Sequence, residues 1–323
     1  MSVNVTPEKI RNYLAPDFFV DDLVLGEVSA ALNSGNHVII SGPPGTGKTT
    51  LAVAVAKAYQ GEDPILSTAS ADWTTFDTVG GYMEGISHSN GMNTGGTAFE
   101  PGIILQSMVS RRWIIIDEIN RAPIDRAIGQ LFTVLAGGNV VLPFRNGLTK
   151  GRIEIKMGDE LSTADVYTCP PDWRLLATMN EYDKKSLFDM SYALMRRFAI
   201  IRLGLPTNYA ADLKVWADAA QIAAPVTANM QDLLTAVAGE RELGPAIFRS
   251  MIAYMVAKRE FQTNDAESYA EALTLFVVPQ LQGVSSQVAQ DIYDSAAKLL
   301  DAPQRQMLKQ SITASTGYAV HIA

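Results

Sequence analysis

A glycine-rich segment of eight residues narrows the possible folds of this 323-residue chain. It reads Gly42-Pro43-Pro44-Gly45-Thr46-Gly47-Lys48-Thr49, between an apolar run at 37–41 and a helical pattern at 50–59. Glycine at these positions lets backbone N–H groups turn inward without Cβ clashes, and the helix that begins at Lys48 adds the positive end of its dipole. The pattern G-x-x-x-x-G-K-[ST] between a strand and a helix predicts a loop that surrounds phosphate groups.

Each position in this loop has an expected task. We expect residues 42–47 and Thr50 to line the phosphates, and Lys48 to reach the β- and γ-phosphates. The Thr49 hydroxyl is expected to ligate Mg²⁺. These features predict binding of a nucleoside triphosphate together with magnesium.

The region that contains this loop alternates short apolar runs with helical patterns. The runs that read as strands buried on both faces are 37–40, 64–67, 112–116, 173–178 and 198–203. Such alternation predicts an α/β fold, a parallel sheet flanked by helices. Within it, the glycine-rich stretch 80–102 reads as a mobile loop, and 138–158 reads as a hairpin that turns at Asn146-Gly147.

The composition of the sequence and the spacing of its apolar residues change after Pro206. Ala, Leu, Gln and Met dominate from there on, and apolar residues recur at helical spacing, for example at Met230, Leu233, Leu234 and Val237. We therefore predict two domains: an α/β nucleotide-binding domain over 1–206 and an all-helical lid domain over 207–323.

Two adjacent acids, Asp117 and Glu118, follow the apolar strand 112–116. In enzymes with this type of phosphate loop, an acid at such a strand end holds Mg²⁺, and its neighbour can polarise the attacking water. We assign Asp117 to the metal and Glu118 to the water. An activated water favours hydrolysis over transfer of the phosphoryl group to a second substrate.

Composition excludes several other classes. The formal net charge is −8 and no chain-wide basic footprint exists, so we expect nucleic acid to be involved only indirectly, if at all. Cys169 is the only cysteine, and the three histidines share no ligand spacing, which argues against a His/Cys metal site. Without a signal-peptide pattern or an apolar run of about 20 residues, we expect a cytoplasmic protein without membrane contact.

Three strings resemble a known family, the AAA+ ATPases of the MoxR, dynein-related and McrB group. They are IDEINRA at 116–122, ATMNEYDKKSL at 177–187 and SYALMRRF at 191–198. These strings are similar to the Walker B, sensor-1 and arginine-finger segments of that group. The order and spacing hold from about residue 30 to 205, and the later helices match only in size and position.

The resemblance implies further site residues. Asn180 would orient the lytic water or touch the γ-phosphate. Arg196 or Arg197 would reach the nucleotide of a neighbouring subunit; Arg197 lines up with the single arginine that precedes Phe in relatives, but the sequence leaves both open. Arg249 is the candidate for the lid arginine called sensor 2, with Arg241 as a weaker substitute, although relatives place that arginine directly after the proline, where this chain has Ala246.

The function expected from these features is a ring-forming ATPase that remodels a protein partner. The ring is expected to be a homo-oligomer, with a hexamer as its size, and the partner is a client or adaptor protein that the sequence does not identify. Two alternatives stay open. One is a McrB-like motor that hydrolyses GTP and drives a partner nuclease, and the other is a nucleotide-gated scaffold with little turnover.

Overall fold

The structure is a computed structural model that describes residues 3–89, 92–147, 149–181, 188–238, 240–261 and 264–321. The chain divides into two compact units. The first unit comprises Met1–Gly42 and Lys48–Leu203, and the second comprises Pro43–Gly47 and Gly204–Ala323. None of the helices within the described ranges has both the length and the apolar character required to span a bilayer.

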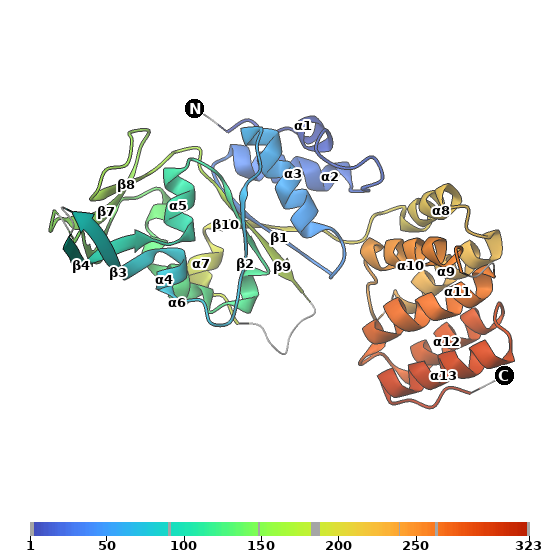
Figure 1. The fold of residues 1–323 in the computed structure, drawn as a ribbon. Helices are drawn as coiled ribbons and strands as arrows, with labels where there is room; N and C mark the ends of the chain where they lie inside the picture. The colour runs from blue at the N-terminus through green and yellow to red at the C-terminus, as the bar shows by residue number, and fades with distance from the viewer. Residues whose placement is uncertain are drawn as a thin grey trace. The chain divides into compact units, whose positions relative to one another are not determined.

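A five-stranded parallel sheet forms the centre of the first unit (Figure 1). Its strands are β1 (His37–Gly42), β2 (Ile65–Thr68), β5 (Ile114–Asp117), β9 (Leu175–Asn180) and β10 (Phe198–Arg202), and their order is β10-β1-β9-β5-β2. Each neighbouring pair is parallel. The predicted parallel sheet is confirmed, and each of the five apolar runs became a strand.

Helices cover both faces of this sheet. The first face carries α1 (Pro7–Arg11), α2 (Asp22–Asn33) and α3 (Lys48–Gln60), and the second carries α5 (Ile103–Val109) and α6 (Ile124–Ile128). Side chains alternate along β1, because Val38 and Ile40 pack in the first core and Ile39 in the second. Burial on both faces explains why the strands read as continuous apolar runs.

Shorter elements complete the first unit. They are the helices α4 (Thr75–Thr78) and α7 (Tyr192–Met195) and the single-turn 3₁₀ helices Ile119–Arg121, Gly129–Leu131 and Val134–Ala136. Thr74 caps α4 in a capping box with Asp77. This box satisfies backbone N–H donors at the start of a helix that is too short to be stable alone.

The stretch 80–102, expected to be a loop, is a β-hairpin. Its strands are β3 (Gly80–Ser89) and β4 (Met92–Pro101), which pair antiparallel. The expectation was wrong because glycine-rich sequence signals a turn, whereas a strand ladder needs only backbone N–H and C=O groups. The register places Gly85 opposite Gly96, and a pair without side chains can form only through backbone groups.

The hairpin predicted at 138–158 is present as β6 (Val140–Arg145) and β7 (Arg152–Met157). A third strand, β8 (Val166–Cys169), pairs parallel with β7 and was not expected from the sequence. Aromatic rings join this sheet to the β3–β4 hairpin, with the centroids of Phe99 and Phe144 5.1 Å apart.

The second unit is helical from residue 209 onward, as the sequence predicted. Its helices are α8 (Tyr209–Ala219), α9 (Ala224–Val237), α10 (Pro245–Lys258), α11 (Asp265–Ala272), α12 (Ser286–Ala297) and α13 (Ala302–Thr316), with a π turn at Leu273–Val277 and a 3₁₀ turn at Val278–Leu281. A buried polar chain ties three elements together: Tyr269 Oη donates to Asn229, whose amide donates to the backbone of Ser295. Because the hydroxyl of Tyr269 and the amide of Asn229 both have partners, this hydrogen-bond network costs little and fixes helix register.

Candidate nucleotide site

Three parallel strands bring the predicted site residues to one edge of the sheet. In the pairing of β1 with β9, Gly42 lies opposite Asn180, and β5 ends at Asp117 beside them. Since parallel strands have their carboxyl ends on the same side, residues that are 138 positions apart in the chain meet here.

Lys48 lies at the start of α3 and is 6% exposed. Its Nζ donates to the carbonyl oxygen of Gly42 at 3.1 Å. Burial lowers the pKa of Lys48 to about 8, and the nearby carboxylates of Asp117, Glu181 and Glu118 limit that fall. The ammonium group is therefore a partly desolvated cation beside Gly42, the first residue of the glycine-rich loop.

The loop before Lys48 has the backbone shape that its sequence predicted. Gly42, Gly45 and Gly47 all have positive φ, and the Thr46 hydroxyl donates to the carbonyl of Pro43 at 3.1 Å. At Gly42 a Cβ would lie 2.2 Å from the backbone oxygen of Leu203, so the site tolerates only glycine. Thr50, in the first turn of α3, is exposed.

Residues 43–47 group with the second unit. Within that unit the backbone N–H of Ala246 donates to the carbonyl of Gly45 at 3.1 Å. A Cβ on Gly244 would lie 2.4 Å from the oxygen of Pro44, so the backbones approach more closely than side chains allow. The start of α10 is thus in direct contact with the glycine-rich loop.

The structure brings Asp117 and Thr49, the two residues predicted to bind metal, into direct contact. The Thr49 hydroxyl donates to Asp117 Oδ1 at 2.6 Å, and the Thr178 hydroxyl donates to the same oxygen at 2.6 Å. A carboxylate and a hydroxyl are hard oxygen donors, which suit Mg²⁺ when phosphate oxygens and water complete its shell. The residues present therefore fit a magnesium ion.

Glu118 is held in place by its backbone and by both carboxylate oxygens. Its φ of 53° lies in the left-handed region, and its N–H donates to the Thr178 hydroxyl at 2.9 Å. Oε1 accepts from the Asn180 amide at 2.7 Å, and Oε2 lies 2.8 Å from Nη1 of Arg121. The structure thus joins Glu118 and Asn180 directly and adds Arg121 to the site.

Asn120 is a buried residue that contacts the backbone of Asn180. It is 5% exposed, its side-chain amide donates to the backbone carbonyl of Asn180 at 3.2 Å, and its backbone carbonyl accepts from the N–H of Phe188. These two bonds anchor the backbone on either side of 182–187. Those six residues, part of the quoted sensor-1 string, lie outside the described residues.

The two adjacent arginines near residue 196 differ in their surroundings. Arg197 Nε donates to the carbonyl of Phe132 at 2.7 Å, its Nη1 donates to Ala193, and its guanidinium lies 4.9 Å from the Phe132 ring centroid. Arg196 is exposed, and its side chain makes no hydrogen bond or ion pair with any described residue. Only Arg196 therefore presents its guanidinium to solvent.

The candidate lid arginines lie in the second unit. Arg249, on α10, is exposed and its guanidinium lies 5.5 Å from the ring centroid of Trp216. Arg241 Nη2 donates to the carbonyl of Gln282 at 2.6 Å. Both thus have contacts inside this unit, and their role toward a nucleotide stays a prediction.

Sequence reasoning missed two residues of the site, Thr178 and Arg121. Thr178 reads as part of an apolar strand. The available signal for its place in the site was its position two residues before Asn180, which puts its hydroxyl on the same side of β9. Arg121 stood inside the quoted Walker B string, but the left-handed turn at Glu118, which brings residues 118 and 121 together, leaves no mark in the sequence.

Comparison with known proteins agrees with this geometry. Residues 37–198 match the family described as AAA domain (dynein-related subfamily). The Type IV methyl-directed restriction enzyme EcoKMcrB subunit of Escherichia coli (strain K12) is 26% identical over 57% of the chain, and protein YojN of Bacillus subtilis (strain 168) is 26% identical over 56%. The chain spans 39% and 52% of these relatives' lengths.

Among solved structures, NtrX from Brucella abortus in complex with ATP matches at 13% identity and a TM-score of 0.39, over 91% of this chain and 67% of that one. The family match covers half of the chain and includes every acid, amide and phosphate-loop residue of the site. The chain belongs to the dynein-related AAA family of ATPases.

Proposed function

We propose that this chain hydrolyses ATP with the residues gathered at the carboxyl edge of its parallel sheet. The observation that carries the proposal is that Thr49 donates to Asp117, Asn180 donates to Glu118, and both carboxylates act electrostatically on the ammonium group of Lys48. Membership of an ATPase family supports the same reaction.

Each residue has a distinct role in this proposal. Lys48 binds the β- and γ-phosphates, and Glu118 takes a proton from the attacking water. Asn180 orients that water, since its amide already lies 2.7 Å from Glu118. Thr49 and Asp117 hold Mg²⁺, which supplies charge neutralisation at the phosphate oxygens.

The finer proposal is that the active form is a homo-oligomeric ring, a hexamer, in which each subunit completes its neighbour's site. Arg196 is the residue assigned to that neighbour, because Arg197 is already bound to Phe132 and Ala193. A head-to-tail contact of this kind closes into a ring. The β3–β4 and β6–β7 hairpins are the segments assigned to act on a protein partner.

Replacing Glu118 by Gln tests the hydrolysis. The variant keeps the hydrogen bond from Asn180 but loses the base, so we expect bound triphosphate and turnover reduced by about 10²–10⁴-fold. The matched control is Glu260→Gln, at an exposed glutamate of the second unit, which should leave turnover unchanged. Unchanged turnover in Glu118→Gln would overturn the proposed function.

A rise in specific activity with protein concentration tests the ring. Sites that need an arginine from a neighbour gain activity as subunits assemble. Constant specific activity from nanomolar to micromolar protein would exclude a shared site and leave only single-chain hydrolysis.

A second candidate function is a GTP-hydrolysing motor subunit that drives a nuclease. The sequence left this alternative open. The observation that favours it is the 26% identity to a restriction-enzyme subunit. Competition between ATP and GTP at equal concentration separates the two. Preferential hydrolysis of GTP would select the second candidate, and binding without turnover of either would select a nucleotide-gated scaffold.

A further inference from the structure

The short helix α7 carries at its end the arginine that is assigned to a neighbouring subunit. Arg196 is the C-cap residue of this helix, and its backbone N–H donates to the carbonyl of Tyr192 at 3.1 Å. α7 has four residues, whereas helices shorter than about 12 residues are marginal on their own. Contacts from outside the helix therefore fix the backbone from which the exposed side chain of Arg196 extends.

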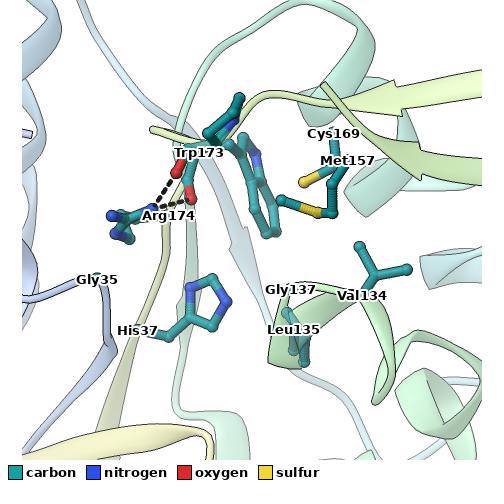
Figure 2. Close-up of a pocket in the computed structure, with 10 residues that line it drawn as sticks. Gly35, His37, Val134, Leu135, Gly137, Met157, Cys169, Trp173 and Arg174 are labelled. Atoms are coloured by element: carbon teal, nitrogen blue, oxygen red, sulfur yellow. Dashed lines mark hydrogen bonds between the residues drawn. The ribbon is translucent and has the colours of Figure 1, made fainter. Parts of the chain in front are cut away.

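The C-terminal end of α7 is held by contacts of Leu194 and Arg197. Leu194 is fully buried, and Nε of Arg197 donates to the carbonyl of Phe132 at 2.7 Å. The segment that contains Phe132 is itself anchored, because Val134 and Leu135 are less than one-tenth exposed and line the pocket shown in Figure 2. These contacts fix the end of the helix, and its start depends on another attachment.

Asp125 provides this attachment at the start of α7. Its Oδ2 accepts from the backbone N–H of Ser191 at 2.9 Å, and its Oδ1 accepts from the Ser191 hydroxyl. Ser191 is the N-cap residue of α7, and its Oγ accepts from the N–H of Leu194 at 3.2 Å. Hydrogen bonds to an ionised carboxylate are roughly twice as strong as neutral ones. Both oxygens of Asp125 thus hold the residue that precedes the helix.

Asp125 lies on α6, a helix that is firmly attached to the core. Ile124, Ala127 and Ile128 of this helix are at most 1% exposed, and the Thr78 hydroxyl donates to the carbonyl of Ala127. The side chain of Asp125 is partly exposed, so its replacement by Ala leaves the packing of α6 intact. A firmly held carboxylate therefore contacts a helix that cannot hold its own direction.

We propose that Asp125 is a positioning residue for Arg196. Its carboxylate fixes the start of α7 and thereby the place at which Arg196 meets the nucleotide of the neighbouring subunit. This inference rests on the proposed function, in which that arginine completes the neighbour's site. Loss of Asp125 then impairs hydrolysis in the neighbour and leaves the chain's own Lys48 and Glu118 intact.

Asp125→Ala should lower turnover with little change in substrate binding. Displacement of a reacting group by about 1 Å costs about 10²-fold, so we expect kcat to fall about 10- to 100-fold. Because the arginine acts on transition-state charge, kcat/KM should fall by the same factor and KM should stay within about twofold. Unchanged kcat in Asp125→Ala would overturn the proposal.

A second variant with a matched control separates positioning from a general loss of stability. Ser191→Ala keeps the N–H bond to Asp125 and loses the hydroxyl bond, so its kcat should fall less than that of Asp125→Ala. Ser285 makes the same kind of contact in the second unit, since it is the N-cap residue of α12 and its hydroxyl donates to Glu240 at 2.5 Å. Ser285→Ala should therefore keep full turnover, and an equal loss of kcat in both serine variants would overturn the assignment.

Mixing of variants shows whose site Asp125 serves. A Glu118→Gln subunit lacks the base but supplies a correctly held arginine to an Asp125→Ala neighbour. We expect an equal mixture of these two variants to regain about a quarter of the wild-type turnover, since about a quarter of its interfaces combine an intact base with an intact arginine. A mixture of Asp125→Ala with Arg196→Ala should gain nothing, because neither variant supplies a correctly placed arginine.

The reverse pattern would overturn the proposal. A gain with Arg196→Ala and none with Glu118→Gln would mean that Asp125 acts on its own site, through the turn that precedes α6. A mixture of Glu118→Gln with Arg196→Ala separates this inference from the proposed function. Its failure to regain turnover would refute the shared site itself, whereas a gain there together with the reverse pattern would refute only the role of Asp125.

Discussion

Replacing Arg196 or Arg197 by Ala should affect different properties of the protein. Arg197 donates a charge-assisted hydrogen bond to Phe132 and lies over its ring. Loss of the hydrogen bond removes about 1.5–3 kcal/mol and loss of the ring contact about 0.5–1 kcal/mol, so Arg197→Ala should lower the free energy of unfolding by about 2–4 kcal/mol. Arg196 is exposed and without such contacts, so its replacement should change stability by less than about 0.5 kcal/mol.

Activity should show the opposite order. An arginine supplied by a neighbouring subunit is worth about 10³–10⁵ in kcat, so Arg196→Ala should lose nearly all turnover while it stays folded. Arg197→Ala should keep most of its turnover at temperatures where it remains folded. Urea denaturation and a phosphate-release assay on the same samples measure both quantities.

A mixing experiment decides whether Arg196 acts on a neighbour. An Arg196→Ala subunit keeps an intact base, and a Glu118→Gln subunit keeps an intact arginine. When equal amounts of the two variants assemble at random, some interfaces combine the base of an Arg196→Ala subunit with the arginine of a Glu118→Gln neighbour. About a quarter of the interfaces therefore regain a complete site. We expect turnover well above the sum of the separate variants. Assembly of the mixture without any gain, or full turnover in Arg196→Ala, would refute the reasoning.

Three further changes follow from the site. Arg121→Gln removes the cation of a partly exposed ion pair and so releases one carboxylate oxygen of Glu118. Turnover at low protein concentration should therefore rise about 1.5- to 5-fold at unchanged KM. A fall in kcat would mean that Arg121 positions the base instead. Because the pKa of Lys48 is lowered to about 8, affinity for a fluorescent ATP analogue should weaken as pH rises from 7 to 9, and pH-independent binding would contradict this. Gly42→Ala should cost at least about 1–3 kcal/mol in urea unfolding, since its Cβ would meet the oxygen of Leu203, whereas Gly26→Ala, with open space around it, should not destabilise α2.

Strands buried on both faces were predictable because burial demands continuous apolar runs. The five core strands were found this way, and the helix that begins at Lys48 followed from the glycine-rich loop. The β3–β4 hairpin was missed because its ladder pairs Gly85 with Gly96 and depends on backbone groups that every residue has. β8 was missed for a related reason: a short strand at the side of a small sheet has no pattern apart from its partner β7.

The structure brings predicted site residues together where the prediction depended on residue type at fixed spacing, and the roles of these residues stay predictions. The phosphate-loop residues and the Asp117–Glu118 pair are determined by local sequence, and parallel strands then bring Asn180 beside them. Thr178 joined through a hydrogen bond across two strands, a relation that spacing alone does not reveal. The different surroundings of Arg196 and Arg197 likewise depend on Phe132, which is 65 residues away from Arg197 in sequence.

The contacts of Glu118 place a condition on hydrolysis. Its two oxygens accept from Asn180 and pair with Arg121, and its backbone is fixed by Thr178. A base must offer a lone pair to water, and both carboxylate oxygens of Glu118 already have a partner. A bound triphosphate presents oxygens that compete for both the amide of Asn180 and the guanidinium of Arg121. In the proposed function, binding of the triphosphate therefore frees the base, and Arg196 of a neighbouring subunit adds the remaining positive charge after assembly.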